Sequence, residues 1–275
     1  MRRYLYFGVH ASPPQWLRRL AGALPFVLLL AVYLGASHLR LKDNPDDKIL
    51  PSLAQMADAV QRMAFRPDPR SDEYVMLKDT TSSLTRLGLG VGISAATGLL
   101  LGLNMGLFPG MGATLLAVVT FISIVPPLAI LPILFISLGV DELAKVALIF
   151  LGIFPLITRD IYGTVAALPK EQITKALSLG ANELQLAYRV VLPQVMPRLI
   201  ETVRLSLGAA WLFLIAAEAI ASTDGLGYRI FLVRRYLAMD VILPYVFWIV
   251  ALGFSFDWLL RRFVAWRYGW YLAVK

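Results

Sequence analysis

The stretch TTSSLTRLGLGVGISAATGLLLGL, at residues 80–103, decides the fold class of this chain. A helix needs about 20 consecutive, mostly apolar residues to cross a bilayer. The stretch has 24 residues, and Arg86 is its one charged side chain. It therefore predicts a helix that spans a membrane.

Five further apolar stretches are long enough, together with their flanks, to do the same. They lie at residues 20–39, 113–138, 143–158, 199–221 and 241–260. The six stretches predict an all-α integral membrane protein with about six transmembrane helices. The first stretch could instead be a cleaved signal peptide, because Arg18 and Arg19 precede it and small residues follow at 35–37.

The composition agrees with a membrane protein and excludes several other classes. Hydrophobic residues make up 58% of the 275 positions and charged residues 16%, and the mean hydropathy is +0.69. Soluble domains hold about 45–50% and about 25%. The chain has no cysteine, which excludes thiolate catalysis and cysteine-ligated metals. It has no glycine-rich phosphate loop that ends in Lys and Ser or Thr. We therefore expect no enzyme activity and no cofactor or metal on this chain.

The charge distribution predicts the orientation, because cytoplasmic segments of membrane proteins carry an excess of Lys and Arg. With both termini in the cytoplasm, the inner segments hold 13 cationic and three anionic residues, and the outer segments hold 10 and 12. The net charge of +8 is therefore assigned to the membrane surface, and no nucleic-acid partner is expected. The expected parts are a cytoplasmic segment at 1–19, a transmembrane domain at 20–260 and an interfacial basic and aromatic tail at 261–275. Within the domain, 40–79 is the first periplasmic loop and 159–198 a cytoplasmic loop.

The cytoplasmic loop at 159–198 differs from the other connections, because its sequence favours two short helices. Residues 171–179 favour the first, and Gly180 is placed to end it. Asn182 can cap the second helix together with Gln185, three residues later. The loop is therefore expected to be folded rather than extended.

The second short helix has an apolar face. Leu184, Tyr188 and Val191 would lie on that face, and Pro193 and Pro197 would stop the helix. An apolar face outside the bilayer needs a cover. The cover is either the ends of the spanning helices or a soluble partner.

Two prolines lie near the middle of the third stretch. Pro126 and Pro127 remove two backbone donors, and irregular backbone at membrane depth is tolerated only within protein or beside a water-filled cavity. The pair therefore marks a wall of a translocation path, with Ser123 and Thr120 nearby, or a packed kink.

Charged and small residues inside the stretches favour packing between helices. Arg86 and Glu218 would pair or face each other across a gate, since intramembrane charges face the interior of a bundle; separately they would reach the interface. Glycines four apart let helices approach closely. The second stretch contains Gly88, Gly92, Gly98, Gly102 and Gly106.

The cytoplasmic loop resembles a known signature. TKALSLG at 174–180, with a Leu-Pro pair downstream, is similar to the EAA loop of permease subunits of binding-protein-dependent ABC importers. That signature has Glu-Ala-Ala, a glycine after three further residues, and Leu-Pro about a dozen residues later. Ala176, Gly180, Leu192 and Pro193 agree with it, whereas Thr174 stands where the family has Glu.

Four other segments, in the same order as in the family, extend the resemblance over most of the chain. They are ILPS at 49–52, VPPLA at 125–129, Ala217-Glu218 with GLG at 225–227, and LLRR at 259–262. Together they resemble the nitrate/sulfonate/taurine (bicarbonate) subgroup of type I importers. The resemblance implies the MetI-like permease fold in a bacterial cytoplasmic membrane.

The resemblance also implies partners and a mechanism. A second permease copy would pair with this one, and each would seat one cytoplasmic ATPase subunit that holds ATP and Mg. A periplasmic binding protein would deliver the solute, and the cytoplasmic loop would transmit closure of the ATPases. The implied ATPase-coupling residues are Thr174, Ala176, Gly180, Ala181, Asn182, Glu183, Leu184, Tyr188, Leu192 and Pro193. The candidate path or gate residues are Thr120, Ser123, Pro126, Pro127, Glu218 and Arg86.

Other functions stay open at this point. The same machinery could import a neutral or cationic nitrogen compound, such as a urea- or guanidine-like solute, in place of a small anion. A partner-independent secondary transporter or channel would not need two capped helices in a cytoplasmic loop. A membrane-embedded enzyme would need clustered acids or histidines, but Glu218 and Asp257 lie at opposite ends of their stretches.

Overall fold

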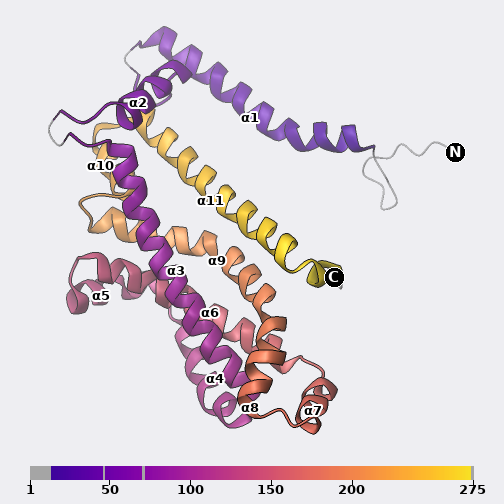
Figure 1. Ribbon diagram of the computed structural model, residues 1–275. Coiled ribbons are helices and arrows are strands. Elements are labelled where there is room, and N and C mark those ends of the chain that lie inside the picture. The colour runs from indigo at the N-terminus through magenta and orange to yellow at the C-terminus, as the bar shows by residue number, and fades with distance from the viewer. Residues whose placement is uncertain (1–13, 46, 70–71, 274–275) are drawn as a thin grey trace.

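Figure 1 shows the computed structural model of the chain, which describes residues 14–45, 47–69 and 72–273. The described residues form helices and no strand, so the all-α prediction is confirmed. Of the predicted segment 1–19, the first 13 residues lie outside the described part. In chain order the helices are α1 Gln15–Asp43, α2 Leu53–Phe65, α3 Val75–Leu107, α4 Pro109–Ile124, η1 Pro127–Ile130, α5 Leu131–Leu138, α6 Glu142–Ala166, α7 Lys170–Ser178, α8 Glu183–Gln185, η2 Leu186–Val191, α9 Leu192–Ile220, α10 Leu226–Val233, η3 Arg234–Tyr236, α11 Met239–Arg267 and α12 Gly269–Ala273.

Five helices are long and apolar enough to cross a membrane: α1, α3, α6, the continuous helix 183–220 and α11. A sixth span is present if α4 and the segment 127–138 count as one bent pair. The predicted third span is thus broken rather than continuous. The two parts meet at an angle of 82° where Pro126 and Pro127 interrupt the backbone hydrogen bonds.

Several helices extend further than the apolar stretches predict. α6 continues past residue 158 to Ala166, and α9 begins at Leu192, so only residues 167–182 separate α6 from the next long helical segment. The first loop is also shorter than predicted, because α1 continues to Asp43 and α3 begins at Val75. Residues 44–74 connect them, and α2 lies within this connection. Hydropathy marks the part of a helix inside hydrocarbon, whereas backbone hydrogen bonds continue into the polar region.

The prediction that Pro193 and Pro197 stop a helix is wrong. Pro193 occupies the first turn of α9, where a missing N–H costs little, and Pro197 lies inside α9. The chain adapts just before Pro193, where residues 186–191 form a π-helix. Because Pro193 cannot donate to the carbonyl of Arg189, the wider turn fits this position. As a result, helix runs unbroken from Glu183 to Ile220.

α3 and α6 pack closely along glycines. A Cβ atom at Gly98 would lie 2.7 Å from Cγ2 of Ile157, and one at Gly102 would lie 2.7 Å from the carbonyl oxygen of Thr158. Gly90 and Gly106 approach α6 in the same way. Gly88 and Gly92 have open space beside them, so the predicted packing role holds only for the three later glycines, and Gly90 was missed.

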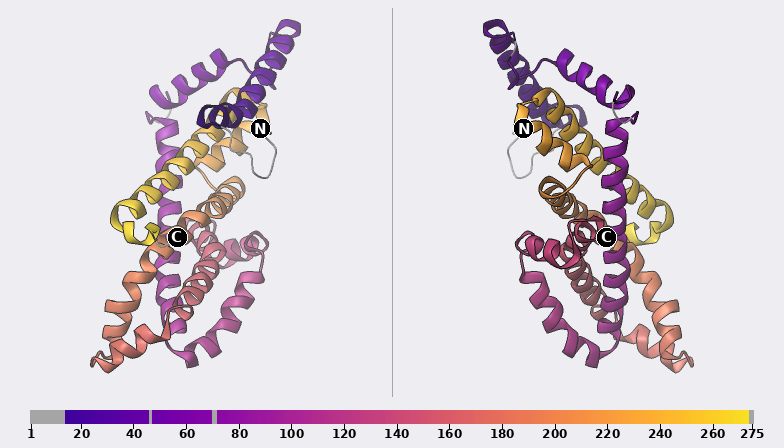
Figure 2. Two further views of the ribbon diagram at one scale, coloured as in Figure 1. Left: turned by 90° about the vertical axis from the view of Figure 1, so that its right-hand side faces the viewer. Right: turned by 90° about the vertical axis from the view of Figure 1, so that its left-hand side faces the viewer.

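The helices form a central group with two flanking helices. α3, α6 and α9 pack against one another, and α11 lies along α9 (Figures 1 and 2). α1 runs apart from this group, and near its C-terminal end it is held to the loop before α2, where Ser37 Oγ donates to the carbonyl of Leu50 at 2.9 Å. Both α1 and α11 present mostly exposed apolar side chains, as expected for helices that face lipid.

The glycine contacts give a test with an internal control. Gly102→Ala should lower the melting temperature of the detergent-solubilised protein, because overpacking against the backbone of α6 costs about 1–3 kcal/mol. Gly92→Ala, on the same helix, adds the same methyl group beside open space. It should leave the melting temperature unchanged or raise it, since alanine favours helix by up to about 1 kcal/mol over glycine. Equal effects of both substitutions would show that close packing at Gly102 does not matter.

Candidate functional site

Arg86 is the centre of a buried cluster of charges at one end of the central helices, which we call the Arg86 cluster. Its guanidinium donates to Glu218 Oε1 at 2.7 Å, to Glu142 Oε1 at 2.7 Å and to Asp224 Oδ1 at 2.5 Å. Arg86 is 3% exposed and Glu218 is fully buried. The predicted Arg86–Glu218 pair is therefore present, as part of a larger network that ties α3 to α6, α9 and the loop before α10.

The chain after α9 wraps around the carboxylate of Glu218. The N–H of Gly227 donates to Glu218 Oε2 at 2.8 Å, and Ser83 Oγ donates to Oε1 at 2.8 Å. Gly225 has φ +113° and lies so close that a Cβ there would be 2.5 Å from the carboxylate. Glycine is needed at this position for both its conformation and its size. Glu218 is thus held by the fold rather than exposed to a passage.

A second ion pair continues the cluster toward α10 and α11. Arg229 Nε donates to Asp79 Oδ2 at 2.8 Å, and Tyr245 Oη donates to the same oxygen at 3.1 Å. Burial alone would lower the pKa of Arg229, but its hydrogen bonds and charge attraction with Asp79 outweigh that effect and raise it. Asp79 and its partners fix α10 and α11 against the start of α3.

The other polar region is a cleft of about 740 Å³ between α4, α6 and α9. Thr120, Ser123 and Pro127, three of the predicted path residues, line it, and Pro126 does not. The full lining is Leu116, Thr120, Ile122, Ser123, Val125, Pro127, Leu151, Gly152, Pro155, Leu156, Arg159, Asp160, Tyr162 and Phe213. Glu218 and Arg86 do not line the cleft, so the predicted path residues fall into two separate places.

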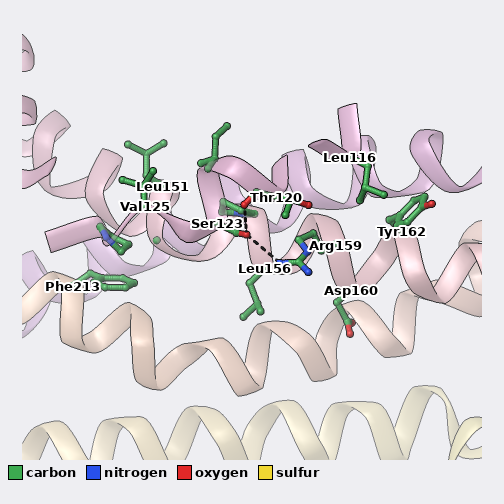
Figure 3. A pocket seen from close by; sticks show the side chains of 14 residues that line it. Leu116, Thr120, Ser123, Val125, Leu151, Leu156, Arg159, Asp160, Tyr162 and Phe213 are labelled. Atoms are coloured by element: carbon green, nitrogen blue, oxygen red, sulfur yellow. Dashed lines mark hydrogen bonds between the residues drawn. The ribbon is translucent and has the colours of Figure 1, made fainter. Parts of the chain in front are cut away.

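Figure 3 shows how the polar groups of the cleft lie. Arg159 Nη1 donates to Ser123 Oγ at 3.1 Å, and Ser123 Oγ in turn donates to the backbone carbonyl of Thr120 at 2.7 Å. The hydroxyl of Ser123 therefore links the last turn of α4 to α6. Asp160 points instead toward α9, where Arg198 Nε donates to its Oδ2 at 2.8 Å.

The predicted coupling residues lie at the opposite end of the molecule from the Arg86 cluster, in α7, the turn after it, α8, η2 and the first two residues of α9 (Figure 1). Gly180 has φ +85° and separates the two helices, as the sequence predicts. Asn182 Oδ1 accepts from the N–H of Gln185 at 2.8 Å, and the Gln185 side chain accepts from the N–H of Asn182, so the predicted capping box is formed. Thr174 and Ala176 lie in α7, and Ala181 and Glu183 lie at the start of the second helix.

The apolar face of the second helix differs from the predicted one. Leu184 and Tyr188 are 69% and 57% exposed, but Val191 is fully buried in the core. The π-helix turns Val191 inward together with Leu186, because its wider turns change which residues share a face. Leu179, in the turn, is 80% exposed. The exposed apolar set is therefore Leu177, Leu179, Leu184 and Tyr188.

Sequence reasoning missed several residues of both polar regions. Glu142 and Asp224 were counted only as outer-loop charges, Lys145 was given no role, and Arg159 and Asp160 were counted only as cytoplasmic charges. The apolar stretch ends at residue 158, whereas α6 continues to Ala166, so Arg159 and Asp160 lie on the helix. Of the acids around Arg86, Glu218 was predicted, and Glu142 and Asp224 could be identified only from the fold.

The Arg86 cluster predicts unequal effects for its two central residues. Arg86→Leu leaves the fully buried Glu218 without its counter-ion, and orphaning a buried charge costs about 3–5 kcal/mol. Glu218→Gln leaves Arg86 with Glu142 and Asp224 and should cost less. We expect a clearly lower melting temperature in detergent for Arg86→Leu than for Glu218→Gln. The reverse order would mean that Glu218 does not depend on Arg86.

Comparison with known proteins agrees with this architecture. The profile of the family described as "Binding-protein-dependent transport system inner membrane component" matches residues 88–267. The taurine transport system permease protein of Escherichia coli strain K12 is 34% identical over 190 residues, which are 68% of this chain and 69% of that protein. The bicarbonate transport system permease protein of Synechococcus elongatus is 32% identical over 196 residues, 70% of this chain and 68% of that protein.

Two further comparisons bear on the fold and the subgroup. A solved inward-facing structure of the MetNI methionine ABC transporter matches with a TM-score of 0.57 at 20% identity, over 69% of this chain and 94% of that chain. The putative aliphatic sulfonates transport permease of Escherichia coli strain K12 is 32% identical over 153 residues, 54% of this chain and 58% of that protein. The resemblance to the nitrate/sulfonate/taurine subgroup and to the MetI-like fold is thereby confirmed. The chain belongs to the family of inner membrane components of binding-protein-dependent transport systems, and it is a multi-pass permease of an ABC importer.

Proposed function

We propose that this chain forms the translocation path of an ATP-driven importer in the bacterial inner membrane, and that α7 and α8 couple it to a separate ATPase. The observation that carries the coupling role is the apolar surface of Leu179, Leu184 and Tyr188, which the Gly180 turn and the Asn182 cap hold outside the spanning helices. A rigid apolar surface of this kind suits a groove in a soluble partner. ATP and Mg would bind to that partner.

The orientation and assembly follow from the same proposal. The excess of Lys and Arg beside α7 and α8 favours the cytoplasm for this end and for both termini. The Arg86 cluster would then lie on the periplasmic side, where a binding protein delivers the solute. A second copy of this permease would close the open side of the cleft, and each copy would seat one ATPase subunit.

The solute is proposed to be a small anion. Taurine, aliphatic sulfonates and bicarbonate are named for three relatives, and each of these solutes carries a charged oxyanion group. The cleft, with Arg159 as its one cation, has the sign of charge that such a group needs.

The coupling proposal is tested by substitution of one exposed tyrosine. Tyr188→Asp places a charge in the apolar surface and should greatly reduce co-purification of the ATPase with the permease from native membranes, because burying an unpaired charge is costly. Tyr236→Asp makes the same change at another exposed tyrosine, in η3 directly after α10. α10 lies at the far end of the molecule from α8 (Figure 1).

The control keeps the outcome interpretable. Tyr236→Asp should retain the ATPase, and both variants should reach wild-type abundance in the membrane. If Tyr188→Asp retains the ATPase at wild-type level, then the surface of α8 is not the coupling surface. If wild type brings down no ATPase at all, the importer assignment for this chain fails.

A further inference from the structure

Arg159 is a cation in a spanning helix whose charge the protein leaves uncompensated. Its guanidinium has one hydrogen bond, from Nη1 to Ser123 Oγ at 3.1 Å. Across the described ranges, no carboxylate lies within 4.0 Å of it. The side chain is exposed to the cleft of about 740 Å³ (Figure 3). Arg159 directly follows the apolar stretch 143–158, and its exposed guanidinium faces the cleft rather than a carboxylate.

The neighbouring acid does not neutralise Arg159. Asp160 lines the same cleft, but its carboxylate is held by Arg198 at 2.8 Å and accepts from the hydroxyl of Thr202, both on α9. Arg198 Nη1 also lies 3.9 Å from Glu201 Oε2, so Arg198 is shared by two carboxylates. Asp160 is thus engaged on the α9 side, and the guanidinium of Arg159 is the charged group that faces the cleft without an ion-pair partner among the described residues.

We propose that Arg159, oriented by the hydroxyl of Ser123, forms with the hydroxyl of Thr120 a transient subsite for the oxyanion group of the transported solute. The inference deepens the proposed function and rests on it. The planar guanidinium presents several N–H donors at a spacing that suits sulfonate or carboxylate oxygens. Ser123 orients one edge of the guanidinium, which leaves its remaining donors for a ligand. Thr120 lies one turn earlier on α4. Its hydroxyl makes no hydrogen bond to the described residues and is therefore available to a ligand.

The rest of the cleft adds few polar contacts, so we expect the subsite to bind its ligand weakly. Its other walls are largely apolar, with Leu116, Leu151 and Phe213 among them. Phe213 packs so close to Gly152 that a Cβ there would be 2.2 Å from the ring, which fixes this wall. A transport path needs sites that attract a solute and also release it. One guanidinium and the hydroxyl of Thr120 in an apolar cleft satisfy both needs.

The test uses cysteine labelling, because the natural chain has no cysteine. Thr120→Cys is introduced into the full chain, which is then placed in lipid nanodiscs. The rates at which the cysteine reacts with a negatively and with a positively charged methanethiosulfonate are measured. The ratio of these two rates, divided by the same ratio for a free thiol in solution, is the labelling preference. We expect the anionic reagent to be favoured by about fivefold or more, as one unit charge within several ångströms would produce. Arg159→Gln should abolish that preference, and Arg159→Lys should keep most of it. Leu116→Cys, elsewhere on the cleft wall, provides a second reporter.

A matched substitution separates the local charge from the overall charge. Arg262→Gln removes a guanidinium from the exposed surface of α11, outside the cleft, and should leave the labelling preference unchanged. In a competition arm with the Leu116→Cys reporter, which keeps the Thr120 hydroxyl, ethanesulfonate should slow labelling and urea should not, and Arg159→Gln should remove the protection.

Several outcomes would overturn the subsite. One is that Arg159→Gln keeps the labelling preference for the anionic reagent. Another is that ethanesulfonate fails to slow labelling, or slows it no more than urea does. The last is that neither the cysteine at 120 nor the one at 116 is labelled. None of these readouts requires an ATPase. A failed subsite with normal co-purification of the ATPase would leave the proposed function intact, and loss of co-purification would refute that function whatever the labelling shows.

Discussion

The contacts of Arg86 with three carboxylates link segments that are far apart in the sequence: α3, α6, the end of α9 and the loop before α10. Arg86 lies on α3, Glu142 begins α6, Glu218 is near the end of α9 and Asp224 lies in the following loop. Arg86 and Glu218 are buried and would be costly alone, so each depends on the other, while the more exposed Glu142 and Asp224 complete the hydrogen bonds of the guanidinium. The glycine contacts between α3 and α6 then allow the helices to meet closely along their length.

The helix from Glu183 to Ile220 connects this cluster with the other end of the molecule. Its 38 residues correspond to roughly 57 Å at 1.5 Å per residue. Tyr188 is near one end, Arg198 and Phe213 lie beside the cleft, and Glu218 is near the other end. A displacement of α8 by a partner would therefore reach the cleft and the Arg86 cluster through one continuous helix. Packed helices transmit such shifts because they do not deform continuously.

The sequence was sufficient for the fold class and for the local chemistry of the cytoplasmic loop. Long apolar stretches predict spanning helices whatever they pack against, and the Gly180 turn and the Asn182 cap depend only on residues a few positions apart. The π-helix before Pro193 was not predictable, because it depends on how one missing N–H is accommodated in a longer helix. For the same reason the inward turn of Val191 was missed. Contacts between distant segments, such as that of Arg86 with Asp224, have no signature in a single sequence.

Arg86 and Arg159, two of the arginines in the spanning helices, show how charge compensation separates structural from functional roles. Arg86 is surrounded by three carboxylates and buried, so it has no free donors and no access for a solute. Arg159 has one hydroxyl as partner and faces a cleft, while its neighbour Asp160 is neutralised by Arg198. A protein that needed Arg159 only for stability would gain from an acidic partner there, as it does at Arg86. Because Arg159 is exposed to the cleft, water can solvate its charge, and the same donors stay available to an anion that enters. This difference in charge compensation, rather than the number of charges, is the reason to place the solute at Arg159.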